Sequence, residues 1–232
     1  MATPRTNRSR PATAAPAAPI AAWVADRAPW GDTVRYGPGV ADEAKLRLLG
    51  QLAGKRVLLL GTGCGQLVTQ TAATGAKVIG IEPDEQLLEQ ARAHCAAGGL
   101  NLEMYQRDFA ELASIRADTV DLVLSVLELA GVADLSRVFR QVHRVLRQEA
   151  PIILSLPHPT RAVAAGATLP LGWQVGEHHG IDHGHTIEDV FTALVRTGFR
   201  VDNLLELPDD SSTPFPAVLV LRARRLGARP GG

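Results

Sequence analysis

Short apolar runs alternate with longer segments of helical periodicity through most of this chain. The runs are bounded by glycine, proline or charged residues and are too short for buried helices, so they predict β-strands. The segments between them predict helices, because their apolar residues recur at spacings of three and four. Strand–helix–strand alternation is typical of a parallel sheet with helices on both faces. The predicted strands are "KRVLLLG", "AKVIGIE", "LNLEMYQRD", "VDLVLSV" and "PIILSLP", and the predicted helices are "QLVTQTAATG", "PDEQLLEQARAHCAAGG", "DLSRVFRQVHRVLR" and "TIEDVFTALVRTGF".

The last two predicted strands interrupt this pattern. They are "RVDNLLEL" and "PAVLVLRARR", and only "PDDSSTPF" separates them. That segment is too short for a crossover helix, so the two strands should form an antiparallel hairpin. The expected fold class is therefore α/β: a Rossmann-like, doubly wound, seven-stranded and mostly parallel sheet that closes with an antiparallel strand pair.

Several residues mark where the predicted helices begin and end. Pro83 stands at the start of one helix, a position that proline favours. Thr186 followed by Asp189 predicts a capping box, with Asp in place of the usual Glu. The pattern "ADEAKLRLLGQL" predicts an amphipathic helix over residues 41–52, which Gly54 should end.

The chain divides into segments of different character. Residues 1–20 are rich in Ala, Pro and Arg and lack acidic residues, which predicts a disordered tail. An organelle transit peptide or a basic arm that contacts a polyanion remains an alternative for this tail. We expect a cap and helix over 21–53, a ligand-binding domain over 54–226, and a short tail over 227–232. Residues 157–185 read as a lid-like insertion in that domain.

Composition narrows the function classes. The chain has 232 residues, which suits one sizeable domain, and a formal net charge of +0. The neutral balance disfavours nucleic-acid partners, and no apolar run is long enough to span a bilayer. Only Cys64 and Cys95 occur, so no disulfide framework is implied and a cytoplasmic location fits best.

Three glycines follow the first predicted strand at alternating positions: Gly61, Gly63 and Gly65. In doubly wound sheets, ligands bind beyond the carboxyl ends of the strands, where a helix N-terminus offers free N–H groups. The glycines therefore favour a ligand site, and a tight turn without a ligand is the alternative.

Carboxylates end the next two predicted strands. Glu82 ends the second, where it can accept hydrogen bonds from two ribose hydroxyls, and a helix-dipole acid is the alternative. Asp108 ends the third, where it can accept from an adenine amino group while Phe109 lines the ring. An N-cap of a short helix is the alternative for Asp108.

These features together resemble the class I S-adenosylmethionine-dependent methyltransferases. The dinucleotide fingerprint G-x-G-x-x-G is not met, because Gln66 stands at its third glycine position. Within the superfamily, the chain from Tyr36 to the C-terminus is similar to the methyltransferase type 11 group of small bacterial proteins. The stretches that carry this similarity are "YGPGVADEAKLRLLGQLAGKRVLLLGTGCGQL", "GAKVIGIEPDEQLLEQARA", "DLVLSVLELAGVADLSRVFRQVHRVLR", "SLPHP" and "HTIEDVFTALVRTGF".

The resemblance implies S-adenosyl-L-methionine as the cofactor and assigns roles to residues of this chain. The glycine loop would approach the methionine part, Glu82 the ribose, and Asp108 with Phe109 the adenine, while Ser125 would lie beside the methyl group. The implied cofactor-binding residues are Tyr36, Gly61, Thr62, Gly63, Cys64, Gly65, Glu82, Pro83, Asp108, Phe109 and Ser125. Cys64 reads as a small packing residue in the turn rather than as a nucleophile.

The resemblance implies a methyltransferase that acts on O or N of a small molecule, but three positions depart from the pattern. Leu59 stands where relatives carry an acid, Ala130-Gly131 where many carry a His pair, and "QEA" where a "PGG" turn is usual. These departures keep a second hypothesis open, a cofactor-binding regulatory or partner protein without turnover. An RNA methyltransferase would need a basic face, and a nicotinamide-dependent reductase is disfavoured by Gln66. The oligomeric state stays open, a homodimer included.

The stretch "GEHHGIDHGHTIED" gathers titratable side chains. A zinc site, a solvated loop and a substrate-facing lid are the three interpretations, and no metal is predicted because the spacing fits no zinc pattern. His185, or His158 in "SLPHP", could act as a general base, since histidine titrates near neutral pH. The clustered residues are Glu177, His178, His179, Asp182, His183 and His185.

Overall fold

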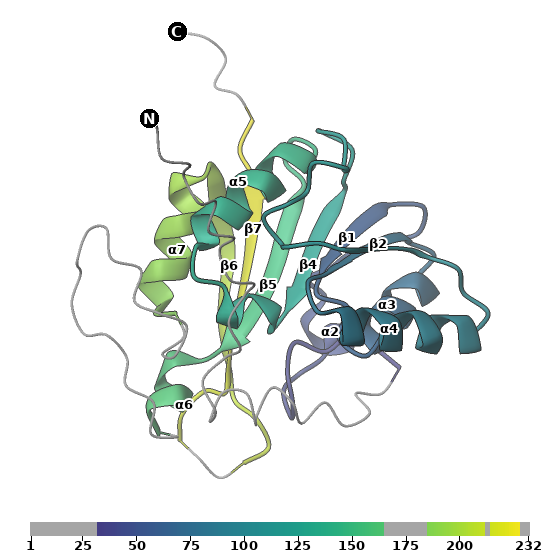
Figure 1. Cartoon of the computed structure of the whole chain (residues 1–232). Coiled ribbons are helices and arrows are strands. Elements are labelled where there is room, and N and C mark those ends of the chain that lie inside the picture. Colours follow the sequence, from purple (N-terminus) through teal and green to yellow (C-terminus); the bar gives the residue numbers. More distant parts are fainter. Residues whose placement is uncertain (1–31, 165–184, 212–213, 228–232) are drawn as a thin grey trace, which may run out of the picture.

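A seven-stranded sheet forms the centre of the structure, a computed structural model that describes residues 32–164, 185–211 and 214–227. The strand order is β3-β2-β1-β4-β5-β7-β6 (Figure 1). Neighbours from β3 to β5 pair in parallel, whereas β7 runs antiparallel to both β5 and β6. The predicted fold class is therefore confirmed, with its closing antiparallel pair. The strands are β1 (Arg56–Leu60), β2 (Lys77–Glu82), β3 (Glu103–Gln106), β4 (Leu122–Val126), β5 (Pro151–Pro157), β6 (Phe199–Leu207) and β7 (Val218–Arg225).

Helices cover both faces of the sheet (Figure 1). Apolar residues of α5 and α7 belong to the core on one face, and those of α3 and α4 to the core on the other. Two short helices, α6 and the 3-10 helix η1, were not predicted, because neither has an apolar repeat long enough to detect. The helices are α2 (Glu43–Leu46), α3 (Gln66–Ala73), α4 (Glu85–Ala97), η1 (Glu128–Gly131), α5 (Leu135–Val145), α6 (Pro159–Ala164) and α7 (Ile187–Arg196).

The apolar runs fix which strands lie at the centre. Every residue of β4 and all of β1 except its first residue are buried, as expected for strands covered on both faces. The edge strands β3 and β6 instead expose several polar side chains, which discourages pairing with another chain. The chain leaves β1 for β2 on one side and later returns to β4 on the other. The point where this order reverses lies between β1 and β4.

Helix starts follow N-cap chemistry that is visible in the sequence. The side chain of Thr186 accepts from the backbone N–H of Asp189, and the Asp189 carboxylate accepts from the backbone N–H of Thr186. The predicted capping box of α7 is therefore confirmed. Pro83, predicted at the start of α4, lies one residue before the N-cap Asp84, whose carboxylate accepts from two backbone N–H groups of the first turn.

The helix predicted over residues 41–52 is wrong in its length, because α2 has only four residues. Arg47 ends it in the left-handed conformation, with φ of 52°. The Glu43 carboxylate then accepts from the backbone N–H of Leu48 at 3.0 Å and of Leu49 at 2.8 Å. A side chain thus replaces the helical carbonyls as acceptor, and the leucines after α2 turn into the core instead of continuing the helix.

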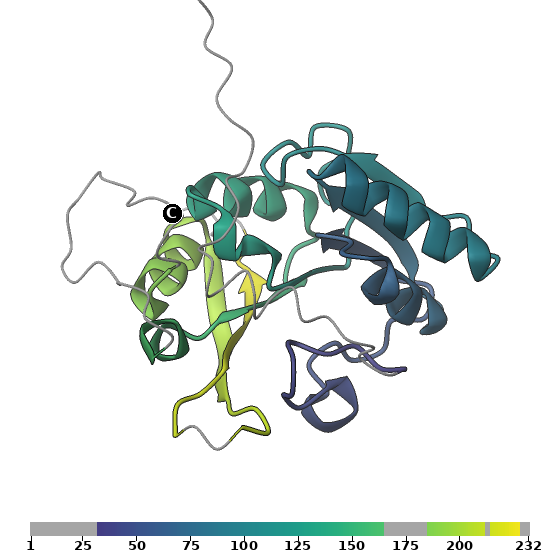
Figure 2. The same cartoon turned by 60° about the horizontal axis from the view of Figure 1, so that its bottom comes forward.

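The segment before β1 packs on the sheet rather than apart from it. Val34, Tyr36 and Leu52 belong to the same core cluster as residues of β1, α3 and α4. Figure 2 shows this segment and the β6–β7 connection at the edge where the parallel strands end. Among the described residues, no helix combines the length and the apolar character needed to cross a membrane.

Three predicted segments lie wholly or mostly outside the described residues. These are the tail over 1–20, the tail over 227–232, of which Gly227 is described, and the clustered residues of the histidine-rich stretch, of which His185 is described. The lid-like insertion predicted over 157–185 begins with the last residue of β5 and α6, and its residues 165–184 also lie outside the described part.

Candidate functional site at the carboxyl edge of the sheet

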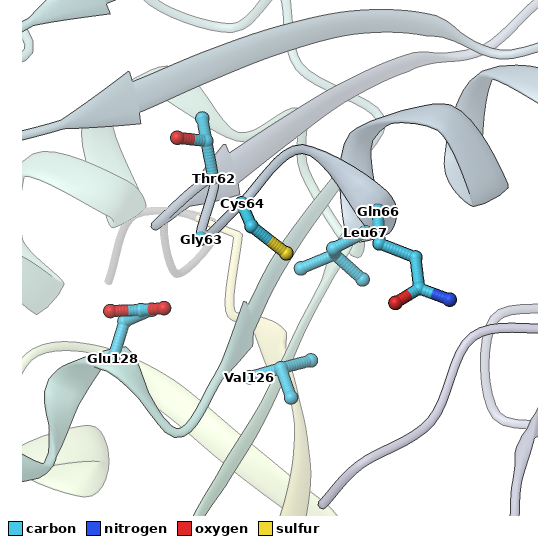
Figure 3. A pocket seen from close by; sticks show the side chains of 7 residues that line it. All are labelled: Thr62, Gly63, Cys64, Gln66, Leu67, Val126 and Glu128. Carbon is cyan, nitrogen blue, oxygen red and sulfur yellow. The ribbon is translucent and has the colours of Figure 1, made fainter. Parts of the chain in front are cut away.

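A hollow opens where the strand order reverses, between the loop after β1 and the chain after β4. It contains about 330 Å³ of empty space, part of which is open solvent. Figure 3 shows the Cys64 thiol and the Leu67 side chain pointing into the hollow from one side, with Glu128 on the other. The lining residues are Thr62, Gly63, Cys64, Gln66, Leu67, Val126 and Glu128.

The glycine loop takes a backbone conformation that other residues rarely adopt. Gly61, Gly63 and Gly65 all have positive φ, at 93°, 52° and 95°. Positive φ costs a residue with a Cβ about 1–2 kcal/mol, so glycine is favoured at each position for conformation alone. The loop then leads directly into α3, with Gly65 as its N-cap.

Two of the glycines also make room for neighbouring groups. A Cβ on Gly61 would lie 1.9 Å from Cγ of Glu128, so the Glu128 side chain occupies the space beside this glycine. A Cβ on Gly65 would lie 2.9 Å from Cα of Ala91 and 3.0 Å from its carbonyl oxygen. Gly65 therefore allows α3 and α4 to approach closely, a packing role that the sequence alone did not indicate.

Glu82 is buried at the end of β2 and holds the glycine loop. Its Oε2 accepts from the backbone N–H of Thr62 at 2.9 Å and from the Thr62 hydroxyl at 3.2 Å. Its Oε1 accepts from the backbone N–H of Asp84 at 3.2 Å. Glu82 thus joins the ends of β1 and β2, and Oε1 keeps acceptor capacity, since a carboxylate has about four lone-pair sites.

The other residues predicted to contact a nucleoside follow the same edge. Asp108 is exposed, and its Oδ1 accepts from the backbone N–H of Ala110 at 2.7 Å, which forms a turn and caps no helix. Phe109 is buried in the core beside this turn. Pro83 is half-buried between β2 and α4. The edge thus presents the Asp108 carboxylate, while Phe109 mainly packs.

Tyr36, predicted to contact the cofactor, is fully buried on the core face shared with α3 and α4. Its hydroxyl donates to Oε2 of Glu43 at 2.5 Å. Burial, the hydrogen bond to Glu43 and the Glu43 charge together raise the pKa of Tyr36 above its usual value of 10.0. In this structure Tyr36 supports the segment around α2 rather than lining the hollow.

Ser125 lies inside the sheet, near the end of β4. Its hydroxyl is buried and donates to the carbonyl oxygen of Leu60 at 3.0 Å, which ties β4 to β1. The neighbouring strand residue Val126, which was not predicted, lines the hollow instead. Leu59, at the position where the resemblance implied an acid, is buried in the apolar core.

His158 is almost fully buried directly after β5. Its Nδ1 lies 3.2 Å from the backbone N–H of Thr160 and 2.7 Å from the Thr160 hydroxyl, and its Nε2 lies 2.8 Å from Oε1 of Glu206. A backbone N–H can only donate, so Nδ1 accepts and Nε2 carries the proton that points at Glu206. Both ring nitrogens are therefore engaged.

His185 precedes α7 and reaches the chain after η1. Its Nε2 lies 2.8 Å from the carbonyl oxygen of Val132, so Nε2 carries a proton and Nδ1 is the basic nitrogen of the neutral ring. The ring thus joins α7 to the segment that also carries Glu128. His158 and His185 do not share a hydrogen bond or a common partner among the described contacts.

Glu128 is the functional candidate that the sequence reasoning missed. It begins η1, two residues beyond the end of β4, and its carboxylate is the one acidic group that lines the hollow among the described residues. The available signal was its place after a central strand, at the edge where doubly wound sheets bind ligands. Among the described residues, no group of three or more potential metal ligands occurs.

The sheet order and the glycine loop at its switch point define the Rossmann-like class of nucleoside-binding α/β folds. Residues 57–149 match the family model of a methyltransferase domain. The ubiquinone biosynthesis O-methyltransferase of Hahella chejuensis is 35% identical over 104 residues, which cover 45% of this chain and 44% of that protein. The match therefore spans less than half the length of this curated relative.

Solved structures share the fold. The S-adenosylmethionine-dependent methyltransferase of Mesorhizobium loti has a TM-score of 0.63 at 24% identity, over 77% of this chain and 94% of that one. The [4+2]-cyclase SpnF has a TM-score of 0.62 at 15% identity, over 78% of each chain. Together the matches show that residues 57–149 are similar to a methyltransferase domain and that this chain shares the fold of solved S-adenosylmethionine-dependent methyltransferases. The finer type 11 assignment stays a prediction.

Proposed function

We propose that this protein transfers a methyl group from S-adenosylmethionine to an oxygen or nitrogen of a small molecule. The observation that carries the proposal is the hollow at the switch point, walled by a glycine loop on one side and by Glu128 on the other. The relatives named ubiquinone biosynthesis O-methyltransferase favour oxygen over nitrogen as the atom that accepts the methyl group.

The residues around the hollow fit this cofactor. The glycine loop leaves space close to the backbone, and Glu82 ends the neighbouring strand with an oxygen that can still accept a ribose hydroxyl. Asp108, at the end of β3, is exposed at the same edge and can accept from an adenine amino group. With this order of strands we expect the adenine at the end of β3, the ribose at the end of β2 and the methionine part beyond β1 and β4.

The chain contributes positioning more than covalent chemistry. S-adenosylmethionine supplies a methyl group on a positively charged sulfur, which is already a good electrophile. The loop and Glu82 orient the donor, and Leu67 and Val126 give the hollow an apolar wall that excludes water. Alignment of donor and acceptor alone can contribute several kcal/mol to catalysis, about 7 or more in favourable cases.

A proton must leave a hydroxyl or ammonium acceptor during the transfer. His185 is the better placed of the two candidate bases, because it is hydrogen-bonded to the segment after η1, and η1 carries Glu128 at the hollow. His158 is buried with both nitrogens engaged, so it would have to break the bond to Thr160 to accept a proton. We therefore propose His185 as the general base.

The second candidate function is that of a regulatory or partner protein that binds the cofactor but does not catalyse methyl transfer. Leu59 replaces a usual acid, and SpnF, a [4+2]-cyclase, has the same fold, so the fold does not decide the reaction. Nucleic acid remains a disfavoured substrate because the formal net charge is +0. We propose a cytoplasmic location for either function, since both Cys64 and Cys95 are free thiols.

One experiment separates the two functions. Calorimetric titration with S-adenosylmethionine and with S-adenosylhomocysteine measures binding, and release of S-adenosylhomocysteine from a panel of phenols, catechols and amines measures turnover. Binding with product formation on an oxygen or nitrogen acceptor supports the methyltransferase. Binding of both nucleosides without turnover on any acceptor favours the partner protein, and no binding of either overturns both functions.

A further inference from the structure

The backbone turns sharply between β4 and η1. Leu127 has φ of 66°, a left-handed conformation that is unfavourable for a bulky residue by about 1–2 kcal/mol. Its backbone N–H donates to the carbonyl oxygen of Ser155 at 3.0 Å, and its side chain is buried in the core. Packing and hydrogen bonding thus hold an unfavourable conformation, and such positions concentrate at functional sites.

The consequence of this turn is the place of the next side chain. Glu128 is directed back across the edge of the sheet onto Gly61, where a Cβ would lie 2.6 Å from its carboxyl carbon. Figure 3 shows its carboxylate on the side of Gly63, facing the hollow. Gly61 and Glu128, which follow the neighbouring strands β1 and β4, therefore form an interlocked pair.

Glu128 is the one charged side chain among the described residues that line the hollow. Among the described residues that line the hollow, the others are glycine, apolar, hydroxyl, amide or thiol side chains. Leu59, one position before the end of β1, is apolar and buried, so β1 offers no carboxylate to the hollow. A carboxylate in a partly enclosed hollow attracts a cation more strongly than one in bulk water.

The ligand expected here brings positive charge to this end. The methionine part of S-adenosylmethionine carries an ammonium group and a sulfonium, and the proposed function places that part beyond β1 and β4. An ammonium can donate three hydrogen bonds, whereas a sulfonium donates none. A side chain that reaches across the loop from η1 is therefore suited to bind the ammonium.

We propose that Glu128 binds the ammonium group of the cofactor's amino-acid end, and that it supplies from η1 the carboxylate that β1 lacks at Leu59. This inference rests on the proposed function, because it needs S-adenosylmethionine in the hollow. It gives Gly61 a second role, which is to leave space for this carboxylate.

The test compares three ligands in matched variants by calorimetric titration. The ligands are S-adenosylmethionine, S-adenosylhomocysteine, which lacks the sulfonium, and the analogue of S-adenosylhomocysteine without the α-amino group. In Glu128→Gln we expect affinity for the first two to fall about tenfold or more, as for a lost charge-assisted hydrogen bond. Affinity for the analogue without the amino group should change less than about twofold, because it has no ammonium to lose.

Controls separate binding from folding. Glu103→Gln makes the same charge change on an exposed side chain at the start of β3, where the parallel strands begin. It should leave all three affinities unchanged. Glu128→Asp keeps the charge with a shorter reach and should bind between wild type and Glu128→Gln. Thermal unfolding without ligand checks each fold, and Glu128→Met replaces Glu128→Gln if the latter does not unfold cooperatively.

Other outcomes overturn the assignment. A loss for S-adenosylmethionine alone would mean that Glu128 faces the sulfonium, and equal losses for all three ligands would mean that it only shapes the loop. Unchanged affinities with slower turnover would show that Glu128 acts on the methyl acceptor and not on the cofactor. If the wild-type protein binds none of the three ligands, the proposed function itself fails, a result that is visible before any variant is measured.

Discussion

Glu82 illustrates how one residue can serve both the fold and the ligand. Its carboxylate is buried and accepts from the Thr62 backbone N–H, so it fixes the loop before any ligand binds. The remaining acceptor capacity of Oε1 is what the proposed ribose contact needs. The two roles can be separated only by measuring stability and affinity in the same variant.

Replacing Glu82 should therefore reduce both quantities. In Glu82→Ala we expect cofactor affinity to fall about tenfold or more, from the loss of charge-assisted bonds of about 1.5–3 kcal/mol. Stability without ligand should fall by about 1–3 kcal/mol, because a buried N–H of Thr62 loses its acceptor. Calorimetric titration and urea unfolding measure the two effects. A folded variant with unchanged affinity would remove Glu82 from the binding site.

Gly63 and Gly65 provide a matched pair, because both have positive φ, but Gly63 lines the hollow whereas Gly65 packs against Ala91. In Gly65→Ala the new methyl group would meet the backbone of Ala91, so we expect a stability loss of about 2–4 kcal/mol from overpacking and strain. In Gly63→Ala we expect a smaller stability loss, about 1–2 kcal/mol, and binding of S-adenosylmethionine below detection. Thermal unfolding and titration test this, and normal binding by Gly63→Ala would show that the glycine serves the turn alone.

At the scale of elements, the segment around α2 depends on one carboxylate. Glu43 accepts from the Tyr36 hydroxyl and from the backbone N–H groups of Leu48 and Leu49. These contacts replace the helical hydrogen bonds that the pattern over 41–52 predicted. They also turn the chain so that Leu48, Leu49 and Leu52 cover the sheet face next to α3.

Removing this carboxylate should loosen the whole segment. In Glu43→Ala three donors lose their acceptor, and we expect the free energy of unfolding to fall by about 2 kcal/mol or more. Glu89→Ala on α4 is a suitable control, because its ion pair with Arg92 is exposed and should contribute less than about 1 kcal/mol. Urea unfolding compares the two, and equal small losses would contradict a supporting role for Glu43.

At the scale of the whole molecule, α5 joins the closing strand pair through His143. Its ring lies 5.5 Å from that of Phe199 at the start of β6, in an edge-to-face arrangement. Burial, and next the charge of Arg225, lower the pKa of His143 below its usual 6.5, while the Leu226 backbone and Asp118 act in the opposite direction. The folded state therefore favours the neutral ring.

The sign of the pH effect follows from this shift. Above pH 6.5 the ring is neutral in folded and unfolded chains, so its contribution to stability is fully present. As the pH falls below 6.5 the unfolded chain binds the proton first, and the free energy of unfolding decreases. Burial alone would raise the pKa of Asp209, but hydrogen bonds from Ser211 and the nearby Arg161 lower it. The contribution of Asp209 to stability is therefore lost only as the pH falls below its usual pKa of 3.8.

We expect His143→Gln to lose less stability than the wild-type protein between pH 6.5 and about pH 5. Urea unfolding at several pH values in this range measures the slope for each protein. His94→Gln, near the C-terminal end of α4, serves as the control for a histidine replacement elsewhere. Identical slopes for wild type and His143→Gln would show that His143 does not carry the effect.

Local sequence patterns determined most of the helices and strands of this protein. The strand runs, the antiparallel ending and the Thr186–Asp189 capping box depend on periodicity, loop length and cap chemistry, which act within about one turn or one strand. The glycine loop was also visible, because positive φ selects glycine locally. These features were therefore predictable from the residues that form them.

Only the tertiary structure decided which side chains meet across the sheet edge. Glu128 packs against Gly61, Glu206 is hydrogen-bonded to His158, and His185 is hydrogen-bonded to the carbonyl oxygen of Val132. The two residues of each pair lie far apart in the sequence. The same holds for Gly65, whose partner Ala91 lies on another helix. Such contacts depend on how twisted strands and packed helices bring distant residues together, and no local pattern encodes that geometry. The sequence by itself thus determined most of the elements and the edge that carries the glycine loop, whereas packing decided which carboxylate lies beside that loop.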